Sequence, residues 1–227
     1  MAPSTTMTMF AAVLSLGAFV NAAPLVARSQ SATYSNTTVP APAPASPSSY
    51  SSPPIIPEGS APVAVVFPDF TSQYNSATGA VDFHTPRGLV SRSPTNGGAD
   101  ITTLVTFQLD NQYKSNQCQL VFDLVDPTSS VSGTAKAQLF TSLAPAFTDS
   151  ESWPNGNLRN QFLGTIDVVA NGRATWEAGS GPGATEDGYF PCSAITGQIY
   201  GGEVVPQGDY DYISWPAGTD GVKILVW

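Results

Sequence analysis

The two cysteines, Cys118 and Cys192, are the residues whose chemistry the sequence predicts most directly. Two cysteines in a chain that enters an oxidising compartment most simply form one disulfide bond. The alternative is a pair of reactive thiols, which would need a nearby histidine or a run of cations, and neither cysteine has such neighbours in the sequence. We therefore expect a disulfide between Cys118 and Cys192, stabilising the fold by about 4 kcal/mol on the loop-entropy estimate.

Carboxylates and one histidine are the candidates for catalysis. Glycosidases hold two carboxyl groups across a sugar, and Glu177 and Glu203 both fall in expected strands, although solvated strand positions explain them equally well. His84 is the only histidine, which excludes zinc sites built from several histidines, and it lies in a loop-like segment. The sequence contains no Gly-x-Ser-x-Gly motif. We expect no catalytic residue, no metal and no cofactor.

Aromatic side chains suit a further kind of chemistry, because their faces stack on sugar rings. Trp153 and Trp215 each stand just before a proline and a turn, in Trp-Pro-Asn-Gly and Trp-Pro-Ala-Gly. Tyr210 and Tyr212 alternate along one expected strand and so point to the same face. These four rings are our candidate glycan-binding residues. The alternative is that they fill the core.

The first residues of the chain predict secretion. A weakly polar to apolar run from Met9 to Val20 ends before small residues that suit signal peptidase, so we expect a signal peptide at 1–22. Such a run is too short to cross a bilayer, which needs about 20 residues, and no transmembrane anchor is expected after processing. Residues 23–60 are rich in Pro, Ser and Ala and predict a disordered spacer. This spacer holds a glycosylation sequon at Asn36.

Residues 61–227 are expected to form one domain made of strands. Apolar or β-branched residues recur at every second position from Ile101 to Leu109 and again from Cys118 to Leu124. We expect two long antiparallel strands here, joined by the loop 110–116 and wet on their polar face. Further strands are expected at 135–141, 162–169, 173–177, 198–204, 211–215 and 222–227, with a turn at Asn171-Gly172. The pattern predicts an all-β fold, an antiparallel β-sandwich of jelly-roll type with one disulfide.

The charge of the chain excludes one class of partner. Its formal net charge is −9, and only 11% of its residues are charged. An acidic surface repels phosphate backbones and offers no basic stripe. We therefore expect no nucleic-acid partner.

Four short motifs carry a resemblance to a known family: Val105–Leu109, Cys118–Phe122, Phe190-Pro191-Cys192 and Gly221–Val226. They resemble the fungal ubiquitin 3 binding protein But-two C-terminal domain family, over about residues 99–227. The resemblance implies an all-β domain with the two cysteines paired, behind a signal peptide and a Ser/Thr/Pro-rich segment. It supplies no catalytic residues. The family is named after an intracellular partner in the ubiquitin pathway, which a secreted chain would not meet.

Together these observations favour a secreted fungal cell-surface or cell-wall-associated module. Its expected role is non-catalytic, either structural or weakly glycan-binding, with cell-wall polysaccharide as the partner. The alternative is a secreted carbohydrate-active enzyme that uses Glu177 and Glu203 as paired carboxylates.

Overall fold

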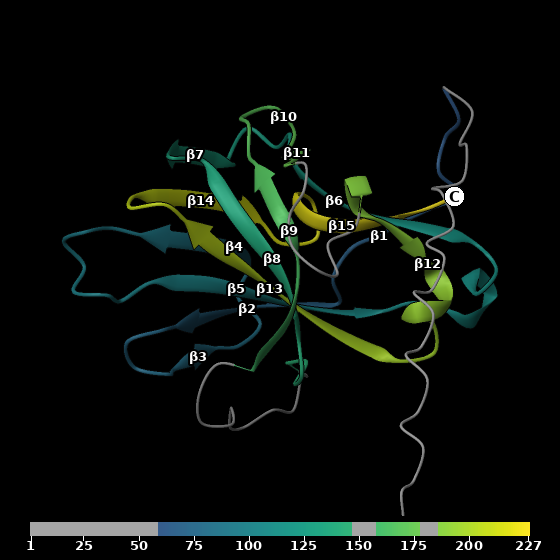
Figure 1. Ribbon diagram of the computed structural model, residues 1–227, viewed down its shortest axis with the longest axis horizontal. Coiled ribbons are helices and arrows are strands. Elements are labelled where there is room, and N and C mark those ends of the chain that lie inside the picture. Colours follow the sequence, from purple (N-terminus) through teal and green to yellow (C-terminus); the bar gives the residue numbers. More distant parts are fainter. Residues whose placement is uncertain (1–58, 147–157, 178–185) are drawn as a thin grey trace, which may run out of the picture. The chain divides into compact units, whose positions relative to one another are not determined.

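The computed structural model describes residues 59–146, 158–177 and 186–227. Two antiparallel sheets make up this part of the chain (Figure 1). The smaller sheet contains β1 (Ala64–Val66), β6 (Gln117–Leu124), β10 (Gly172–Arg173), β12 (Tyr189–Pro191) and β15 (Gly221–Val226). The larger sheet contains β2 (Phe70–Asn75), β3 (Val81–Asp82), β4 (Arg87–Arg92), β5 (Ile101–Gln108), β7 (Ser130–Gly133), β8 (Lys136–Ser142), β9 (Arg159–Asp167), β11 (Thr175–Trp176), β13 (Ile199–Gln207) and β14 (Asp211–Pro216). Three short 3-10 helices, η1 (Asn111–Tyr113), η2 (Glu186–Gly188) and η3 (Cys192–Ala194), lie in the connections.

The larger sheet curls into half a barrel, and its strands follow the order β11, β9, β8, β13, β5, β4, β14 and β7. β2 pairs with β5 and carries β3 at its other edge. Figure 1 shows β7, β14, β4, β5, β2 and β3 following one another down one side. The long strand β13 joins the two halves of the sheet, because it pairs with β5 along one edge and with β8 along the other.

The predicted all-β antiparallel fold with one disulfide is confirmed. The strands expected from the later part of the sequence correspond to β8, β9, β13, β14 and β15. β9 and β11 pair antiparallel around the expected turn, where Asn171 has a φ of 57° and Gly172 begins β10. Cys118 and Cys192 are bonded, with their Cα atoms 5.0 Å apart.

The hairpin expected between the two most regular strands is wrong. β5 pairs with β13 and β2 in the larger sheet, whereas β6 pairs with β15, β12 and β10 in the smaller sheet. Phe107 and Phe122 from these strands meet in one hydrophobic core cluster between the sheets. Alternation shows which side chains share a face but does not show which strand lies alongside. Residues 109–116 therefore pass from one sheet to the other.

The second face of β5 was expected to be wet, and it is buried. Thr102 is 2% exposed and Thr106 is 1% exposed. Their hydroxyls donate to the Glu203 carboxylate and to the Ala146 carbonyl at 2.7 and 2.8 Å. Buried hydroxyls are tolerated where they find such acceptors, so the curl of the larger sheet can enclose threonines on this face.

Trp215 is the largest side chain between the two sheets. It comes from β14, is 2% exposed, and meets the edge of the Phe122 ring from β6 at a centroid distance of 5.1 Å. Two glycines make room for it. A Cβ atom on Gly88 of β4 would lie 2.1 Å from the indole, and one on Gly221 of β15 would lie 2.0 Å from it. The indole thus lies directly against the backbone of both sheets.

Replacing Gly221 with alanine tests this packing, with Gly218→Ala as the matched control. Both glycines have positive φ, 82° and 76°, but only the added methyl at 221 would meet the indole. Left-handed backbone strain should cost about 1 to 2 kcal/mol in either variant, and overpacking should add about 1 to 3 kcal/mol in Gly221→Ala. Urea denaturation measures both losses. Equal losses would contradict the packing described for Trp215.

Candidate functional site

Glu203, one of the two carboxylates considered for catalysis, is buried in an ion pair. Its side chain is 1% exposed, and the Arg159 guanidinium donates to both of its oxygens at 2.9 Å. Thr102 donates a further hydrogen bond at 2.7 Å. Arg159 also lies over the ring of Phe140, 4.7 Å from its centroid. In this arrangement the carboxylate links β13 to β5 and β9 and does not face solvent.

Glu177, the second carboxylate, belongs to a different ion pair. It accepts a hydrogen bond from Lys136 of β8, and the same ammonium group pairs with Asp167 of β9 at 2.9 Å. The hydrogen bond to Glu177 and then that to Asp167 raise the pKa of Lys136 above its ordinary value. The structure therefore places Glu177 and Glu203 with separate cations.

His84 lies in an exposed turn between β3 and β4. Its φ is 55°, and its ring meets the edge of the Phe70 ring at a centroid distance of 5.0 Å. Its backbone N–H donates to the Ser72 hydroxyl at 3.2 Å.

Tyr210 and Tyr212 form an exposed pair, which we call the tyrosine platform. Their exposed fractions are 48% and 41%, and they are the aromatic residues among the exposed large hydrophobic side chains of the described chain. Tyr212 stands opposite Ser91 of β4 and Ser132 of β7. Directly opposite residues share a face of the sheet, so hydroxyl groups flank this ring on both sides. A Cβ atom on Gly133 would lie 2.6 Å from the Tyr210 ring, which therefore lies close over the end of β7.

The structure corrects the placement of Trp215 and does not describe two other predicted residues. Trp215 is buried against Phe122, so it is a core residue and forms no part of a surface platform. The alternation of β14 explains this, because Trp215 is two residues from the buried Ile213 and points inward with it, whereas Tyr212 points outward. Trp153 and Asn36 lie outside the described residues, as do the predicted signal peptide and most of the predicted spacer.

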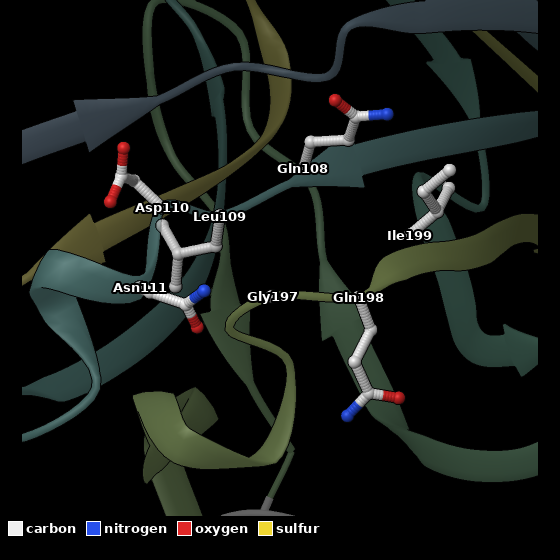
Figure 2. A pocket seen from close by; sticks show the side chains of 7 residues that line it. All are labelled: Gln108, Leu109, Asp110, Asn111, Gly197, Gln198 and Ile199. Carbon is white, nitrogen blue, oxygen red and sulfur yellow. The ribbon is translucent and has the colours of Figure 1, made fainter.

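A polar pocket at the start of β13 was not predicted from the sequence. It has a volume of about 470 Å³ and combines residues 108–111, at the end of β5, with residues 197–199, at the start of β13 (Figure 2). Its lining offers three side-chain amides, one carboxylate and an exposed aliphatic group: Gln108, Asn111, Gln198, Asp110 and Ile199. We call it the amide pocket. Residues 112–196 separate its two segments in the chain, and no local motif signals their meeting.

Backbone contacts bring the two walls of the amide pocket together. The N–H of Gly197 donates to the Leu109 carbonyl at 3.1 Å, and Leu109 bridges Thr196 in parallel. A Cβ atom on Gly197 would lie 2.5 Å from the Asn111 amide oxygen. Asp110 caps η1, because its carboxylate accepts a hydrogen bond from the Gln112 backbone at 2.8 Å.

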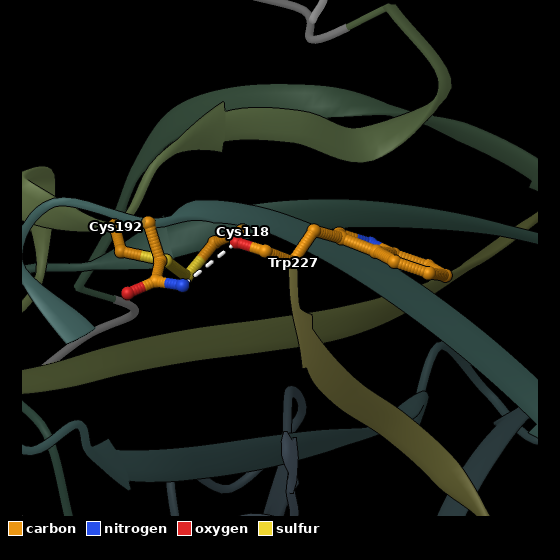
Figure 3. The surroundings of a disulfide bond; sticks show 4 residues. Cys118, Cys192 and Trp227 are labelled. Carbon is orange, nitrogen blue, oxygen red and sulfur yellow. Dashed lines mark hydrogen bonds between the residues drawn. A yellow bond between two sulfur atoms is a disulfide. The ribbon is translucent and has the colours of Figure 1, made fainter. Parts of the chain in front are cut away.

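The disulfide holds the segment that forms one wall of this pocket. Cys192 begins η3, and its N–H donates to the Asn116 carbonyl at 3.1 Å. Figure 3 shows the bond beside Trp227, whose carbonyl accepts from the Asn116 side chain at 2.8 Å. The backbone N–H groups of Ile195 and Thr196 both donate to the Cys192 carbonyl. The bond therefore attaches residues 192–196 to the start of β6.

The described residues contain no group of three or more His, Cys, Asp or Glu side chains placed to hold a metal ion. Within the same ranges, no helix has the length and apolar character to cross a membrane. No family model and no curated protein matches the chain.

Removing the cation from the buried ion pair tests the structural role of Glu203. Arg159→Met would leave the carboxylate buried without its guanidinium, and we expect a loss of about 3 to 5 kcal/mol in unfolding free energy. Adding Glu203→Gln to that variant removes the buried charge and should restore much of the loss.

Arg173→Met is the matched control for this experiment. Arg173 is half exposed, and its partner Asp123 would still be paired with Lys223 at 3.3 Å. The control should lose less than about 1 kcal/mol. Denaturation in urea measures each loss, and an Arg159→Met variant as stable as the control would refute the structural role.

Proposed function

We propose that this chain is a secreted module of a fungal cell surface or cell wall that binds neutral polysaccharide weakly and catalyses no reaction. The observation that carries the proposal is the exposure of Tyr212 of β14 and of Tyr210 just before that strand, while Trp215 of β14 is buried. The compartment rests on the signal sequence and on the resemblance to the But-two C-terminal family.

The tyrosine platform has the chemistry for stacking on sugars. Tyr210 directly precedes β14, and its carbonyl accepts a hydrogen bond from the Thr134 N–H at 2.8 Å, which continues the pairing beyond the end of β7. Residues two apart in such an extended chain are separated by about 6.6 Å, so the two rings can contact neighbouring sugar units of one chain. Each stacked ring contributes about 0.5 to 1.5 kcal/mol beyond its buried area. Ser91 and Ser132 add hydroxyl groups that can exchange hydrogen bonds with sugar hydroxyls.

These magnitudes imply weak binding to a single chain. Two rings supply about 1 to 3 kcal/mol, and a dissociation constant of 1 mM already needs about 4 kcal/mol. An insoluble wall presents many chains at once, so retention there can exceed the affinity for one oligosaccharide. Binding to neutral glycan through rings should not depend on salt.

The amide pocket is the weaker candidate for the same ligand. Its side chains can hydrogen-bond sugar hydroxyls, but Gln108, Asn111 and Gln198 are exposed, and exposed amides exchange hydrogen bonds with solvent when no sugar is bound. Exchanging water for sugar at such groups gains only about 0.5 to 1.5 kcal/mol per bond. No aromatic ring lines the pocket among the described residues. Stacking on the platform therefore supports the proposal better.

The environment of the two carboxylates supports a role without catalysis. A general acid or base must reach the proton that it transfers. Both oxygens of Glu203 are engaged with Arg159 in a side chain that is 1% exposed, and Glu177 is paired with Lys136. If the parent protein cleaves glycan, and a folded Glu177→Gln or Glu203→Gln variant does not, the result would favour the carbohydrate-active enzyme instead.

Retention on insoluble β-glucan and chitin tests the proposal. We expect the protein to be retained equally at low and high salt, and Tyr210→Ala or Tyr212→Ala to weaken retention by about 2- to 12-fold, the loss of one stacked ring. Tyr212→Phe keeps the ring and should be retained like the parent.

Asn111→Ala is the control for the amide pocket and should leave retention unchanged. Circular dichroism checks that each variant is folded. If neither polysaccharide retains the parent, or if the folded alanine variants are retained equally well, the platform does not bind glycan.

A further inference from the structure

A cavity lies between the two sheets, next to the disulfide-held segment and separate from the tyrosine platform. It has a volume of about 290 Å³. Its walls are largely apolar and come from β6, β9, β12, β13, β15 and the residue after η3: Leu120, Leu163, Phe190, Tyr200, Ile224 and Ile195. Leu120, Leu163 and Tyr200 also line a smaller void of about 10 Å³ against Phe107, deeper in the core.

The residues that line this cavity differ in their exposed fractions, and the difference shows where the cavity opens. Ile224 is fully buried, Ile195 is 3% exposed and Leu120 is 7% exposed. Gln161 and Ala194, which also line the cavity, are exposed. The apolar floor therefore lies in the core, and the mouth lies between β9 and η3.

The lining is uncharged in the described residues. Its polar members are Thr141, Gln161 and Tyr200, and none of the side chains that line it is acidic or basic. Burial raises the pKa of Tyr200 to about 12, so its phenol keeps its proton and can donate a hydrogen bond at any physiological pH. A charged ligand would lose its hydration here without gaining an opposite charge.

We propose that this cavity binds a small, neutral, largely apolar molecule that carries one hydrogen-bond acceptor. An apolar cavity of about 150 Å³ holds one benzene molecule, so this one has room for roughly ten carbon atoms. The apolar body occupies the floor of Leu120, Ile195 and Ile224, and the acceptor accepts a hydrogen bond from the Tyr200 phenol. The disulfide keeps the wall at η3 in place, because Cys192 immediately precedes Ser193 and Ala194 of that helix.

Titration of the whole protein with 1-octanol, followed by methyl NMR, tests the proposal. We expect saturable shifts of the Leu120, Leu163, Ile195 and Ile224 methyl signals, with methyls on the outer faces of the sheets unchanged. Octanoate and octylammonium, which have the same chain but a charged head, should bind at least about ten-fold more weakly. Shifts that do not saturate, or equal binding of all three, would overturn it.

Two pairs of variants localise the binding. Ala194→Trp puts a large side chain at the mouth and should abolish the octanol shifts, whereas Ser193→Trp, at an exposed neighbour that does not line the cavity, should not. Tyr200→Phe removes the donor and should weaken octanol binding by about two- to ten-fold. Tyr212→Phe, the same change on the surface, should have no effect. Unchanged binding in both Ala194→Trp and Tyr200→Phe would refute the site.

Discussion

The contact of Trp215 with the backbone of both sheets is the constraint on which the rest of the structure depends. The indole fills the space between β4, β6 and β15, and it fits only because residues 88 and 221 have no side chain. It also fixes which side chains of β14 face the core. With Ile213 and Trp215 inward, the alternation of the strand leaves Tyr212 on the outer face between two serines. The exposure of the tyrosine platform is therefore a consequence of core packing.

The disulfide fixes the segment that leads into the start of β13. The segment from Cys192 to Gln198 forms a wall of the amide pocket on one side and of the apolar cavity on the other. Loop segments have few buried contacts of their own and are commonly less stable than the strands they join. Here the bond to β6, together with the hydrogen bond from Gly197 to Leu109, holds such a segment against the sheets. A polar pocket and an apolar cavity thus both adjoin one short segment at the start of β13.

Local patterns in the sequence predicted the disulfide and the strands β5, β6, β8, β9, β13, β14 and β15, because both follow from residue type and spacing. They did not predict β2, β4 or β7. They did not predict which strands pair: the alternation in β5 and β6 is equally compatible with a hairpin and with two facing sheets. Trp215 was proposed as a surface ring on the strength of the proline that follows it. A glycine within a strand indicates that another group lies close to the backbone at that position. Gly88 was therefore the residue in the sequence that could have indicated a buried side chain packed against this strand. The burial of Glu203 depends on Arg159, 44 residues away, and no local pattern reports it.

Tyr210 and Tyr212 are exposed whereas Trp215 is buried, and aromatic NMR during titration with a soluble β-glucan oligosaccharide tests whether only the exposed rings bind sugar. We predict that the ring signals of Tyr210 and Tyr212 shift as sugar is added, while the Trp215 indole signals stay constant and protected from a soluble paramagnetic probe. Shifts of the Trp215 indole together with its exposure to the probe, or tyrosine signals that do not respond to sugar, would contradict it.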